Sequence, residues 1–430
     1  MAETAGKVLE GVFAIKKPKS LSSAQVLRDL QQAFAKSKTF APLRQKADAE
    51  RDVSHSKRRK IDTDSVFKMG HGGTLDPLAT GVLIVAIGRG TKSLGSFLGG
   101  TKTYETVVLF GKSTDTYDVA GRVVADAAYE QVTKSLVEEK MVKFRGAIKQ
   151  VPPIYSALKI NGVKAYDYAR SGKELPRQLE SRDMVVDECV LVEWYEGGKH
   201  DFRWPAAEAS AADKATARKL MKVETQTTDL EHTTVEGSTV DQADASEALS
   251  PDANVSAKSA EVSKDELNKM APAEKAALHT HDIPELSDTP ADAPAARIRL
   301  TSSSGFYVRS FAHDLGIACG SYGTMAELTR TRQSSYTITD PPPEHHTLCL
   351  TYDDLSKGED VWGPKITTVL ETWMAKNPVV TNADKPDDRD RPEWNKFRGR
   401  GRDRRNNYRS GDKRKWHESR PRRNSSSPDL

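Results

Sequence analysis

Few of the residues that build metal centres, disulfide frameworks or membrane spans are present in this sequence. Its 430 residues include three cysteines, Cys189, Cys319 and Cys349, whose wide spacing matches neither a metal-ligand pair nor a disulfide framework. Such cysteine usage is typical of a reducing compartment. No apolar run reaches the length of a transmembrane helix. We therefore expect no bound metal and no membrane segment.

Large apolar residues are scarce as well. Hydrophobic residues make up 37% of the chain, aromatic residues 7% and charged residues 29%. For a compact globular protein the hydrophobic fraction is low and the charged fraction is high. The formal net charge of +4 conceals a segregation, because the middle of the chain is acidic and its end is basic. This composition predicts a folded core with long disordered additions.

Changes in composition predict the domain boundaries. Residues 1–204 and 297–377 are expected to form two parts of one core, and residues 205–296 a disordered acidic insertion. A structureless loop of roughly ninety residues inside a domain would be abnormal, which argues for an insertion. Residues 39–64 look like a smaller, basic insertion. Its segment Lys57-Arg58-Arg59-Lys60 fits a nuclear-import signal, a phosphate contact or a solvated loop.

The end of the chain, residues 378–430, is rich in arginine and glycine with interleaved aromatic residues such as Trp394, Phe397 and Tyr408. This composition cannot bury a core and predicts disorder. Arginines for phosphates and aromatic rings for bases suit RNA binding with little sequence preference. A solubilising tail is the alternative interpretation.

Apolar patterns predict the elements of the core. Alternating or continuous apolar segments predict strands at residues 11–15, 82–87, 102–111, 185–194 and 297–301. Helical spacing predicts helices that start at Ser22 or Ser23 and near Arg309, a third over 131–145, and one or two more within 351–376. Trp362-Gly363-Pro364 is expected to form a turn.

The stretch from Met69 to Gly81 combines glycines, one imidazole, one acid and two hydroxyls directly before an apolar strand. Glycines let the backbone approach a ligand or adopt a positive φ, and such loops often carry chemistry. Asp76, which precedes Pro77, has two interpretations: a helix cap or a nucleophilic carboxylate. The loop pattern alone favours the cap, since Asp-Pro turns are frequent. Its spacing does not match a phosphate-binding loop.

The twelve residues Gly70-His71-Gly72-Gly73-Thr74-Leu75-Asp76-Pro77-Leu78-Ala79-Thr80-Gly81 resemble the signature of the TruB family of pseudouridine synthases. Further blocks are similar to the family in the same order, and together they cover most of 11–35, 67–182 and 297–337. These blocks are Gly-Val-x-x-Ile-x-Lys-Pro (11–18), Lys-x-Tyr (102–104), Thr-Asp-Thr-x-Asp (114–118), Pro-Pro-x-Tyr-Ser-Ala-x-Lys (152–159), Gly-x-x-x-Tyr-x-x-Ala-Arg (162–170), Gly-x-Tyr-x-Arg-x-x-x-x-Asp-Leu-Gly (305–316) and Leu-x-Arg-x-Arg (328–332). Lys16 and Ser20 depart from it, since the family usually has an acid and a glycine there.

The resemblance implies an α+β fold with a mixed, mainly antiparallel central sheet flanked by helices, which agrees with the strands and helices expected above. It also implies an isomerase that converts uridine 55 in the T loop of tRNA to pseudouridine. Such an enzyme flips the base out of the stack and needs no cofactor.

The same resemblance assigns the site residues. Asp76 becomes the expected nucleophile, attacking ribose C1′ or uracil C6, and Arg309 its charge partner. Tyr104 would stack on the base, and His71 would fill the gap that the flipped uridine leaves. The expected contacts to RNA are Lys17, Lys92 and Lys159 for phosphates, Tyr155 for the RNA strand and Leu328 for the pocket wall.

Two other functions stay open. A guide-RNA-dependent synthase subunit would be expected to carry an accessory RNA-binding domain after the core, and none is evident. A non-catalytic tRNA-binding chaperone could rely on the basic tail, although the set of Asp76, Tyr104 and Arg309 speaks against lost catalysis. Messenger RNA uridines are open as further substrates. We expect a monomer by default and a nuclear location, a mitochondrial one or both, with the cytoplasm also open.

Overall fold

The structure is a computed structural model that describes residues 6–53, 66–156, 158–165, 168, 176–211, 214 and 285–379. The chain divides into two compact units, Met1–Lys376 and Asn377–Leu430. Every element below belongs to the first unit. Several predictions concern residues outside the described ranges: Lys57–Lys60, the Tyr166 to Arg170 part of the family pattern, the middle of the acidic insertion and almost all of the basic tail. The expected compartment therefore stays a prediction.

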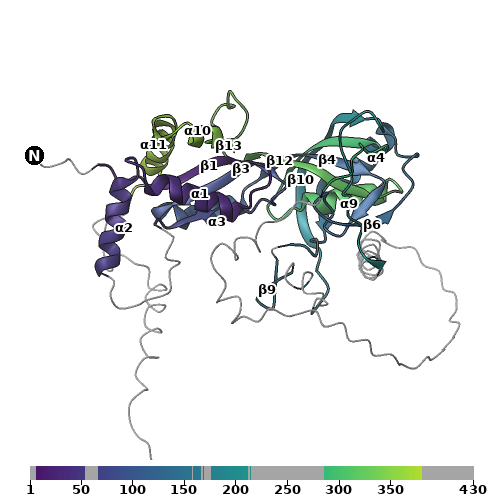
Figure 1. Cartoon of the computed structure of the whole chain (residues 1–430), viewed down its shortest axis with the longest axis horizontal. Helices are drawn as coiled ribbons and strands as arrows, with labels where there is room; N and C mark the ends of the chain where they lie inside the picture. Colours follow the sequence, from purple (N-terminus) through teal and green to yellow (C-terminus); the bar gives the residue numbers. More distant parts are fainter. Residues whose placement is uncertain are drawn as a thin grey trace, which may run out of the picture. The chain divides into compact units, whose positions relative to one another are not determined.

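A mainly antiparallel sheet of ten strands organises the first unit (Figure 1). The strands are β1 (Gly11–Lys17), β2 (Met69–His71), β3 (Thr80–Ile87), β4 (Lys102–Phe110), β7 (Gly146–Gln150), β10 (Arg182–Tyr195), β11 (Ala295–Ser302), β12 (Gly323–Gln333), β13 (Tyr336–Thr337) and β14 (Thr347–Leu348). The main order is β1-β3-β12-β4-β11-β10-β7, with β2 on β3, and with β13 between β12 and β14. The pairs β3–β12 and β13–β14 are parallel. Two small hairpin sheets lie apart, β5 (Lys112–Thr114) with β6 (Val123–Asp126) and β8 (Lys159–Ile160) with β9 (Val163–Lys164).

Helices cover this sheet. They are α1 (Ser23–Ala35), α2 (Ala41–Val53), α3 (Leu94–Gly99), α4 (Lys134–Met141), α9 (Val308–Ala318), α10 (Tyr352–Ser356) and α11 (Glu359–Lys376), with short 3₁₀ segments η1 (Gly88–Ser93) and η2 (Val142–Phe144). The α+β prediction with a mainly antiparallel sheet is confirmed, and each predicted strand is present with bounds shifted by at most a few residues. None of the helices in the described ranges is long and apolar enough to cross a membrane.

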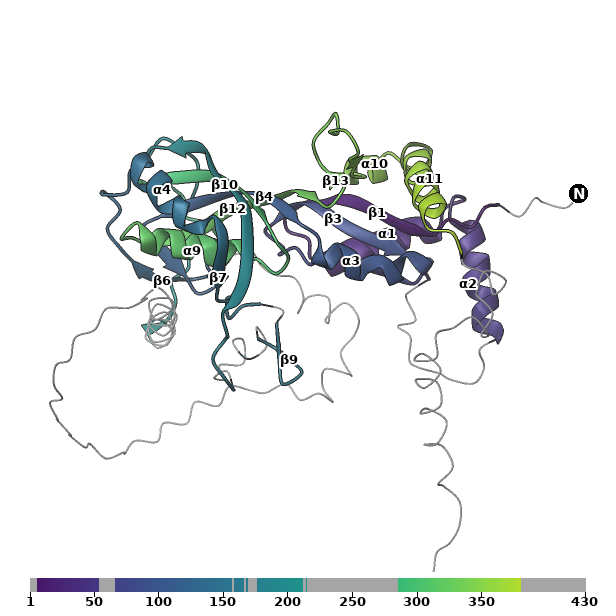
Figure 2. The same ribbon diagram turned by 180° about the vertical axis from the view of Figure 1, so that it is seen from behind.

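The core explains why the sequence adopts these elements. Successive residues of β1 point to opposite faces of the sheet, so Phe13 packs in one cluster with Leu30 of α1 and Val12 in another with Tyr336. Helix α11 lies beside β1, so the first and last parts of the unit are neighbours in both views (Figures 1 and 2). Packing of α11 against β1 thus supports β3, the strand that follows the Asp76 loop and pairs with β1.

Part of the expected basic insertion is helix α2, preceded by Phe40, whose ring stacks on Phe34 at 4.4 Å between centroids. That this segment is an insertion stays a prediction, whereas one local prediction was wrong. The expected turn at Trp362-Gly363-Pro364 lies inside α11. Trp362 is buried and its ring centroid is 5.1 Å from that of Phe34. Burial of these aromatic rings outweighs the local preference of Gly-Pro for a turn.

The ends of the expected acidic insertion also belong to the ordered core. Strand β11 begins at Ala295, two residues before its predicted start. The backbone N–H of Ala206 donates to Glu285 O at 2.8 Å, and that of Ala291 donates to Phe202 O at 2.9 Å. The two ends of the insertion therefore pair with each other, which brings β10 and β11 into register across the intervening residues.

Candidate active site

The loop that carries Asp76, residues 72–79 and hereafter the aspartate loop, is tied to several elements. Ser23 of α1 accepts a hydrogen bond from Leu75 N at 2.9 Å and donates one to Leu75 O at 3.1 Å. From β12, Gln333 Nε2 donates to Gly72 O at 2.6 Å and Arg330 Nη2 to Gly73 O at 3.2 Å. A loop held at both its start and its middle presents Asp76 in a defined position.

Asp76 does not cap a helix. Residues 76–79 form a turn in which Ala79 N donates to Asp76 O at 3.1 Å, and the chain then enters β3. Gly81 at the start of β3 has a φ of +99°, and a Cβ there would lie 2.2 Å from Arg330 O. Only glycine allows this close approach between β3 and β12. The approach sets where the aspartate loop leaves the sheet.

The carboxylate of Asp76 forms an ion pair with Arg309 of α9. Arg309 Nε lies 2.9 Å from Asp76 Oδ2. Asp76 exposes 38% of its side chain and Arg309 only 9%. Solvent and substrate can therefore reach the carboxylate from one side while the arginine supports it from the other. The predicted proximity of Asp76 and Arg309 is confirmed, whereas their chemical roles stay predictions.

Arg309 has further partners that fix the plane of its guanidinium group. Nη1 donates to Thr116 O at 3.0 Å and Nη2 to Tyr155 O at 2.8 Å. Burial alone would lower the pKa of Arg309, but Asp76 and Asp118 outweigh this effect and raise the pKa. The group stays charged, and its planar fork serves several acceptors at once.

A second carboxylate, Asp118, shares this arginine. Its Oδ2 lies 3.8 Å from Arg309 Nε, and its Oδ1 accepts hydrogen bonds from Thr116 Oγ1 at 2.6 Å and Ala120 N at 3.0 Å. Burial raises the pKa of Asp118 from 3.8 to about 6, against the opposing effect of Arg309. Asp118 was not among the predicted site residues, although it ends the Thr-Asp-Thr-x-Asp block that resembles the family.

Tyr104 and Leu328 project on the face of the sheet where the aspartate loop lies. Tyr104 of β4 is directly opposite Arg330 of β12, and Leu328 is two residues earlier on the same strand. Residues opposite each other, or two apart on one strand, share a face. Arg330 on this face reaches Gly73 of the loop. Both Tyr104 and Leu328 are buried, and their roles as stacking ring and pocket wall stay predictions.

His71 ends β2, immediately before the aspartate loop. Its Nδ1 is buried and has no hydrogen-bond partner among the described residues. Burial, followed by the charge of Arg330, lowers the pKa of His71. A neutral imidazole at the edge of the loop is compatible with its predicted role of filling the gap left by a flipped base. Stacking an uncharged ring between bases costs less desolvation free energy than stacking a charged ring.

The prediction that Lys17 contacts a phosphate is wrong. Its side chain is fully buried, and Nζ donates to Pro18 O at 2.8 Å, Leu21 O at 2.7 Å and Pro77 O at 3.1 Å. Burial lowers the pKa of Lys17 to about 8, although Asp76 opposes the shift. Lys17 therefore ties β1 and the start of α1 to the aspartate loop. Its sequence context, a lysine in a basic turn, gave no sign of this burial.

We expect Lys17→Met to lower the free energy of unfolding by about 2 kcal/mol, because three carbonyl groups lose a charged donor. Chemical denaturation measures this loss. The salt dependence of RNA binding should stay unchanged in this variant. Lys92→Met is the matched comparison, since Lys92 is exposed, and it should weaken RNA binding and its salt dependence. An altered salt slope in Lys17→Met alone would contradict the buried role.

The turn after β1 shows how the structure accommodates a departure from the family pattern. Ser20 occupies the position where the family has glycine, and its φ is +73°. Its N–H donates to Pro77 O at 2.9 Å. Lys16, the other departure, is exposed. The turn thus retains a left-handed conformation without glycine, and one hydrogen bond links it to the residue after Asp76.

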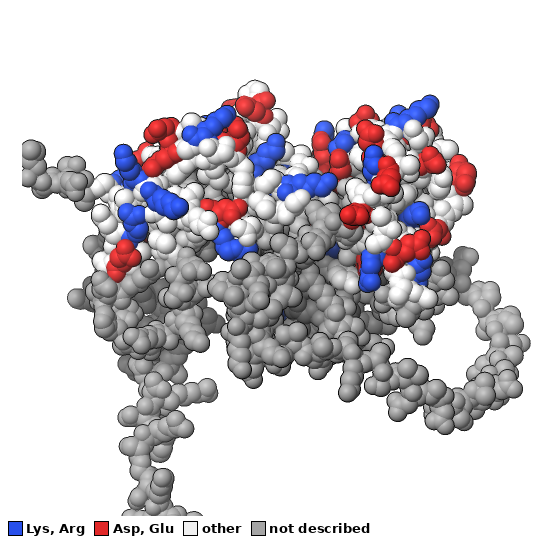
Figure 3. Space-filling model, in the orientation of Figure 1, with Lys and Arg blue, Asp and Glu red and all other residues white. Residues whose placement is uncertain are grey.

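The predicted RNA contacts differ in accessibility. Lys92 in η1 and Lys159 in β8 are exposed, and Tyr155 is partly buried with its carbonyl bound to Arg309. Basic and acidic side chains are interspersed on the face in Figure 3. This view gives no single basic surface among the described residues. Phosphate contacts by Lys92 and Lys159 stay predictions.

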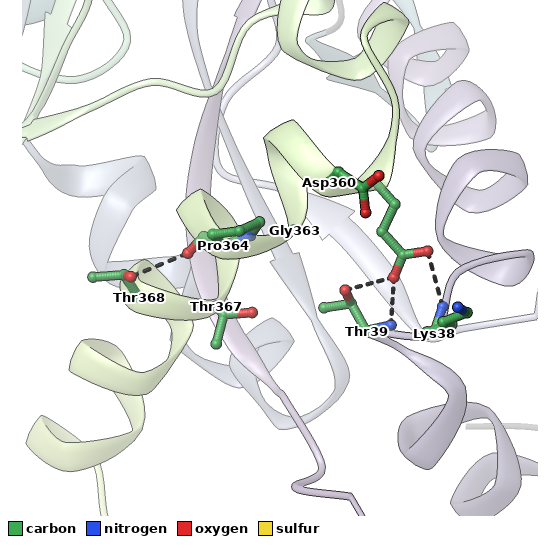
Figure 4. Close-up of a pocket in the computed structure, with 8 residues that line it drawn as sticks. Lys38, Thr39, Asp360, Gly363, Pro364, Thr367 and Thr368 are labelled. Carbon is green, nitrogen blue, oxygen red and sulfur yellow. Dashed lines mark hydrogen bonds between the residues drawn. The ribbon is translucent and has the colours of Figure 1, made fainter.

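An open groove of about 600 Å³ lies at the start of α11. It is lined by Lys38, Thr39, Glu359, Asp360, Gly363, Pro364, Thr367 and Thr368, none of which is a predicted site residue (Figure 4). The carboxylate of Glu359 accepts from Lys38 N, Thr39 N and Thr39 Oγ1, at 2.6 to 3.1 Å. The groove is therefore a polar junction between α11 and the α1–α2 turn. Among the described residues, no group of three or more His, Cys, Asp or Glu side chains could hold a metal ion.

Arg330 and Gln333 are further residues of the site that were not predicted. Arg330 is the largest fully buried side chain, and its Nε donates to Val82 O at 2.7 Å. Gln333 is also fully buried, and its Nε2 bonds Phe97 O as well as the aspartate loop. Arg330 is the first arginine of the Leu-x-Arg-x-Arg block, but no local feature of the sequence indicates that it is buried. Only the β3–β12 pairing puts both residues beneath the loop.

Comparison with known proteins gives a consistent result. Residues 58–208 match the model of the TruB family pseudouridylate synthase N-terminal domain. The chain is 36% identical over 332 residues to tRNA pseudouridine synthase 4 of Schizosaccharomyces pombe, which covers 77% of this chain and 80% of the relative. It is 31% identical over 375 residues to tRNA pseudouridine synthase 4 of Saccharomyces cerevisiae, covering 84% and 85%.

Among solved structures, a Cbf5–Nop10–Gar1 complex is similar with a TM-score of 0.38 and 18% identity, over 82% of this chain and 55% of that chain. The two fungal sequence relatives match most of the chain across both parts of the core. The twelve-residue signature around Asp76 lies within the region matched by the family model. This protein belongs to the TruB family of pseudouridylate synthases.

Proposed function

We propose that this protein isomerises uridine 55 in the T loop of tRNA to pseudouridine, with Asp76 as the nucleophile. The observation that carries the proposal is the 2.9 Å ion pair between a half-exposed Asp76 and a buried Arg309. A carboxylate that a neighbouring arginine holds in a defined position is suited to nucleophilic attack. The names of the two fungal relatives support tRNA as the substrate.

The reaction breaks the bond between ribose C1′ and uracil N1 and forms a bond between C1′ and C5. The proton lost from C5 is balanced by the proton gained at N1, so the step is an isomerisation. Asp76 would attack C1′ or C6, and Arg309 would hold its carboxylate in place. Tyr104 would stack on the base, and Leu328 would close the pocket around it. His71 would occupy the gap left by the flipped nucleotide, which offsets part of the unstacking cost of a few kcal/mol.

The test is modification mapping of an unmodified tRNA transcript incubated with the purified protein alone. We expect pseudouridine at position 55 and none in a transcript with cytidine at that position. Conversion without any guide RNA also separates this function from that of a guide-dependent subunit. Conversion at another uridine, or no conversion, would contradict the proposal. tRNA refolding that survives Asp76→Asn would reveal a chaperone role beside catalysis.

The rate of isomerisation should depend on the ionisation of Asp118. Because the pKa of Asp118 is raised to about 6, we expect the single-turnover rate to fall as the pH drops below about 6. Protonation then removes one of the two anions that orient Arg309. Asp118→Asn should lower the rate at pH 7.5. In this variant the rate should no longer fall as the pH drops below about 6. Rates measured from pH 5 to 8 test both statements.

The same shift predicts how stability depends on pH. Burial raises the pKa of Asp118 in the folded protein above its ordinary value of 3.8. The folded state therefore binds more protons between pH 3.8 and about 6, and this group makes the protein less stable as the pH rises through that window. Asp118→Asn should remove this contribution. A variant that is less active yet no less stable at pH 7 would separate the functional role of the carboxylate from a structural one.

A further inference from the structure

The turn that contains Asp118 is strained at the preceding residue. Tyr117 has a φ of +61°, in the left-handed region that residues with a side chain rarely adopt. Thr116 and Asp118, on either side of it, both contact Arg309. Strained residues persist where surrounding contacts over-determine them. Contacts between this turn and α9 are therefore expected to hold Tyr117 in its conformation.

The side chain of Tyr117 stacks on His313 of α9. The two ring centroids are 4.1 Å apart and the rings are inclined by 16°. Both residues are buried. Tyr322 lies nearly parallel to His313, with an inclination of 12° and a centroid distance of 6.3 Å. The aromatic stack therefore lies in the protein interior and is not available for binding a ligand.

Helix geometry connects this stack to the active site. Arg309 and His313 are four residues apart on α9, so their side chains lie on the same face one turn apart. Arg309 contacts Thr116 and Asp118, while His313 contacts the residue between them. The turn is thus attached to two successive turns of one helix, once by the guanidinium group and once by a pair of rings.

Other hydrogen bonds of the turn are made to β12 or within the turn. Tyr117 O accepts from Met325 N at 3.0 Å, and Val119 N donates to Met325 O at 3.1 Å, which attaches the turn to β12. Thr114 Oγ1 donates to Asp118 O within the turn at 2.7 Å. These bonds fix the turn relative to the sheet. Its contacts with α9 include the stack and the bonds to Arg309.

The chemistry of His313 suits this position. Burial lowers its pKa to about 4, so the ring is neutral at ordinary pH. Ser113 Oγ lies 3.4 Å from its Nδ1. A neutral ring adds no second buried cation one helical turn from Arg309. The guanidinium group therefore stays the cationic partner of Asp118 and Asp76 on this face of α9.

We propose that Tyr117 and His313 are positioning residues for catalysis: their stack holds the Thr116–Asp118 turn at the distance from α9 that aligns Arg309 with Asp76. The proposal rests on the proposed function. It assigns both residues an effect on the chemical step and none on RNA affinity. Neither residue touches the substrate.

The test compares variants that remove a ring with variants that keep one. Tyr117→Gly permits the positive φ and removes the ring, and His313→Ala removes the other ring. Tyr117→Phe and His313→Phe retain the stack. We expect the first two to lower the single-turnover rate about tenfold, since small misplacements of catalytic groups are costly, with tRNA affinity within about twofold. The phenylalanine variants should keep at least about half of the wild-type rate. The double variant Tyr117→Gly/His313→Ala should be no slower than the slower single variant.

Leu370→Ala is the control for general destabilisation, because Leu370 is buried in α11 against β1. If the ring-removing variants lose no more rate than Leu370→Ala at an equal loss of melting temperature, the proposal is overturned. It is also overturned if the phenylalanine variants are equally slow, or if affinity falls in place of the rate.

A second measurement does not depend on activity. The Nε–H proton of Arg309 can be followed by nitrogen-15 NMR, and its exchange with solvent should be slow in the wild type and in Tyr117→Phe. It should be clearly faster in Tyr117→Gly and His313→Ala. Equal exchange in all variants would reject the positioning role. If the wild type forms no pseudouridine, the proposed function fails while this measurement still decides the role of the stack.

Discussion

The Asp76→Asn variant should bind tRNA with the affinity of the wild type and form no detectable pseudouridine. Asparagine retains the shape of the side chain but has no carboxylate to attack the substrate. Removal of a nucleophile can lower a rate on the order of a million-fold. The aspartate loop should keep its conformation, because it is held through the backbone and through Ser23, Gln333 and Arg330. Single-turnover assays and equilibrium binding measure the two properties separately.

Asp126→Asn is the matched control for this experiment. It makes the same chemical change at an exposed carboxylate in β6, whose side chain is 61% exposed and lies 3.1 Å from Lys112. An exposed ion pair contributes little, so both rate and stability should be close to those of the wild type. Measurable turnover in Asp76→Asn, at a rate above that of the uncatalysed reaction, would remove Asp76 from the role of nucleophile.

The second large effect is expected for Arg309→Met. The substitution leaves Asp118 buried without its cation and breaks the ion pair with Asp76, so we expect a loss of about 3 kcal/mol in the free energy of unfolding. Catalysis should also fall below detection, since the ion pair that orients the Asp76 carboxylate is lost. Arg309→Lys should recover part of the stability but little activity, because one ammonium group cannot serve acceptors on Asp76, Asp118 and two backbone carbonyls.

A double variant separates the two consequences. Arg309→Met/Asp118→Asn has no unpaired buried carboxylate at position 118, so it should be more stable than Arg309→Met and equally inactive. Arg122→Met provides a control, because this arginine is 46% exposed and pairs with Asp115 at 3.4 Å. Its removal should change stability by no more than about 0.5 kcal/mol. Recovery of activity together with stability in the double variant would show that Arg309 has a structural role only.

Sequence reasoning was most successful where a pattern was long or periodic. The alternating and apolar segments predicted strands β1, β3, β4, β10 and β11, because side chains on a sheet repeat every second residue. It was less successful where a local preference competed with distant packing. Trp362 and Pro364 suggested a turn, but the burial of Trp362 against Phe34 keeps them within a helix.

The functional residues divide in the same way. Asp76 and Arg309 were found because each lies in a block with a specific spacing. Asp118 lies in such a block too. The spacing of that block does not reveal that Asp118 and Asp76 contact the same arginine, which lies far along the chain. Lys17 was expected to contact a phosphate because affinity for RNA depends largely on backbone charge. Its burial depends on Pro77 and Leu21, which approach it only in the folded protein.

Contiguous motifs and periodicity along the chain were enough to predict the family, strands β1, β3, β4, β10 and β11, and the pairing of Asp76 with Arg309. The burial of Lys17, the place of Asp118 as a second anion on Arg309 and the stack of Tyr117 on His313 became evident in the folded protein. Desolvation, charge pairing and ring stacking depend on distances between segments far apart in the chain, and local patterns do not encode these distances.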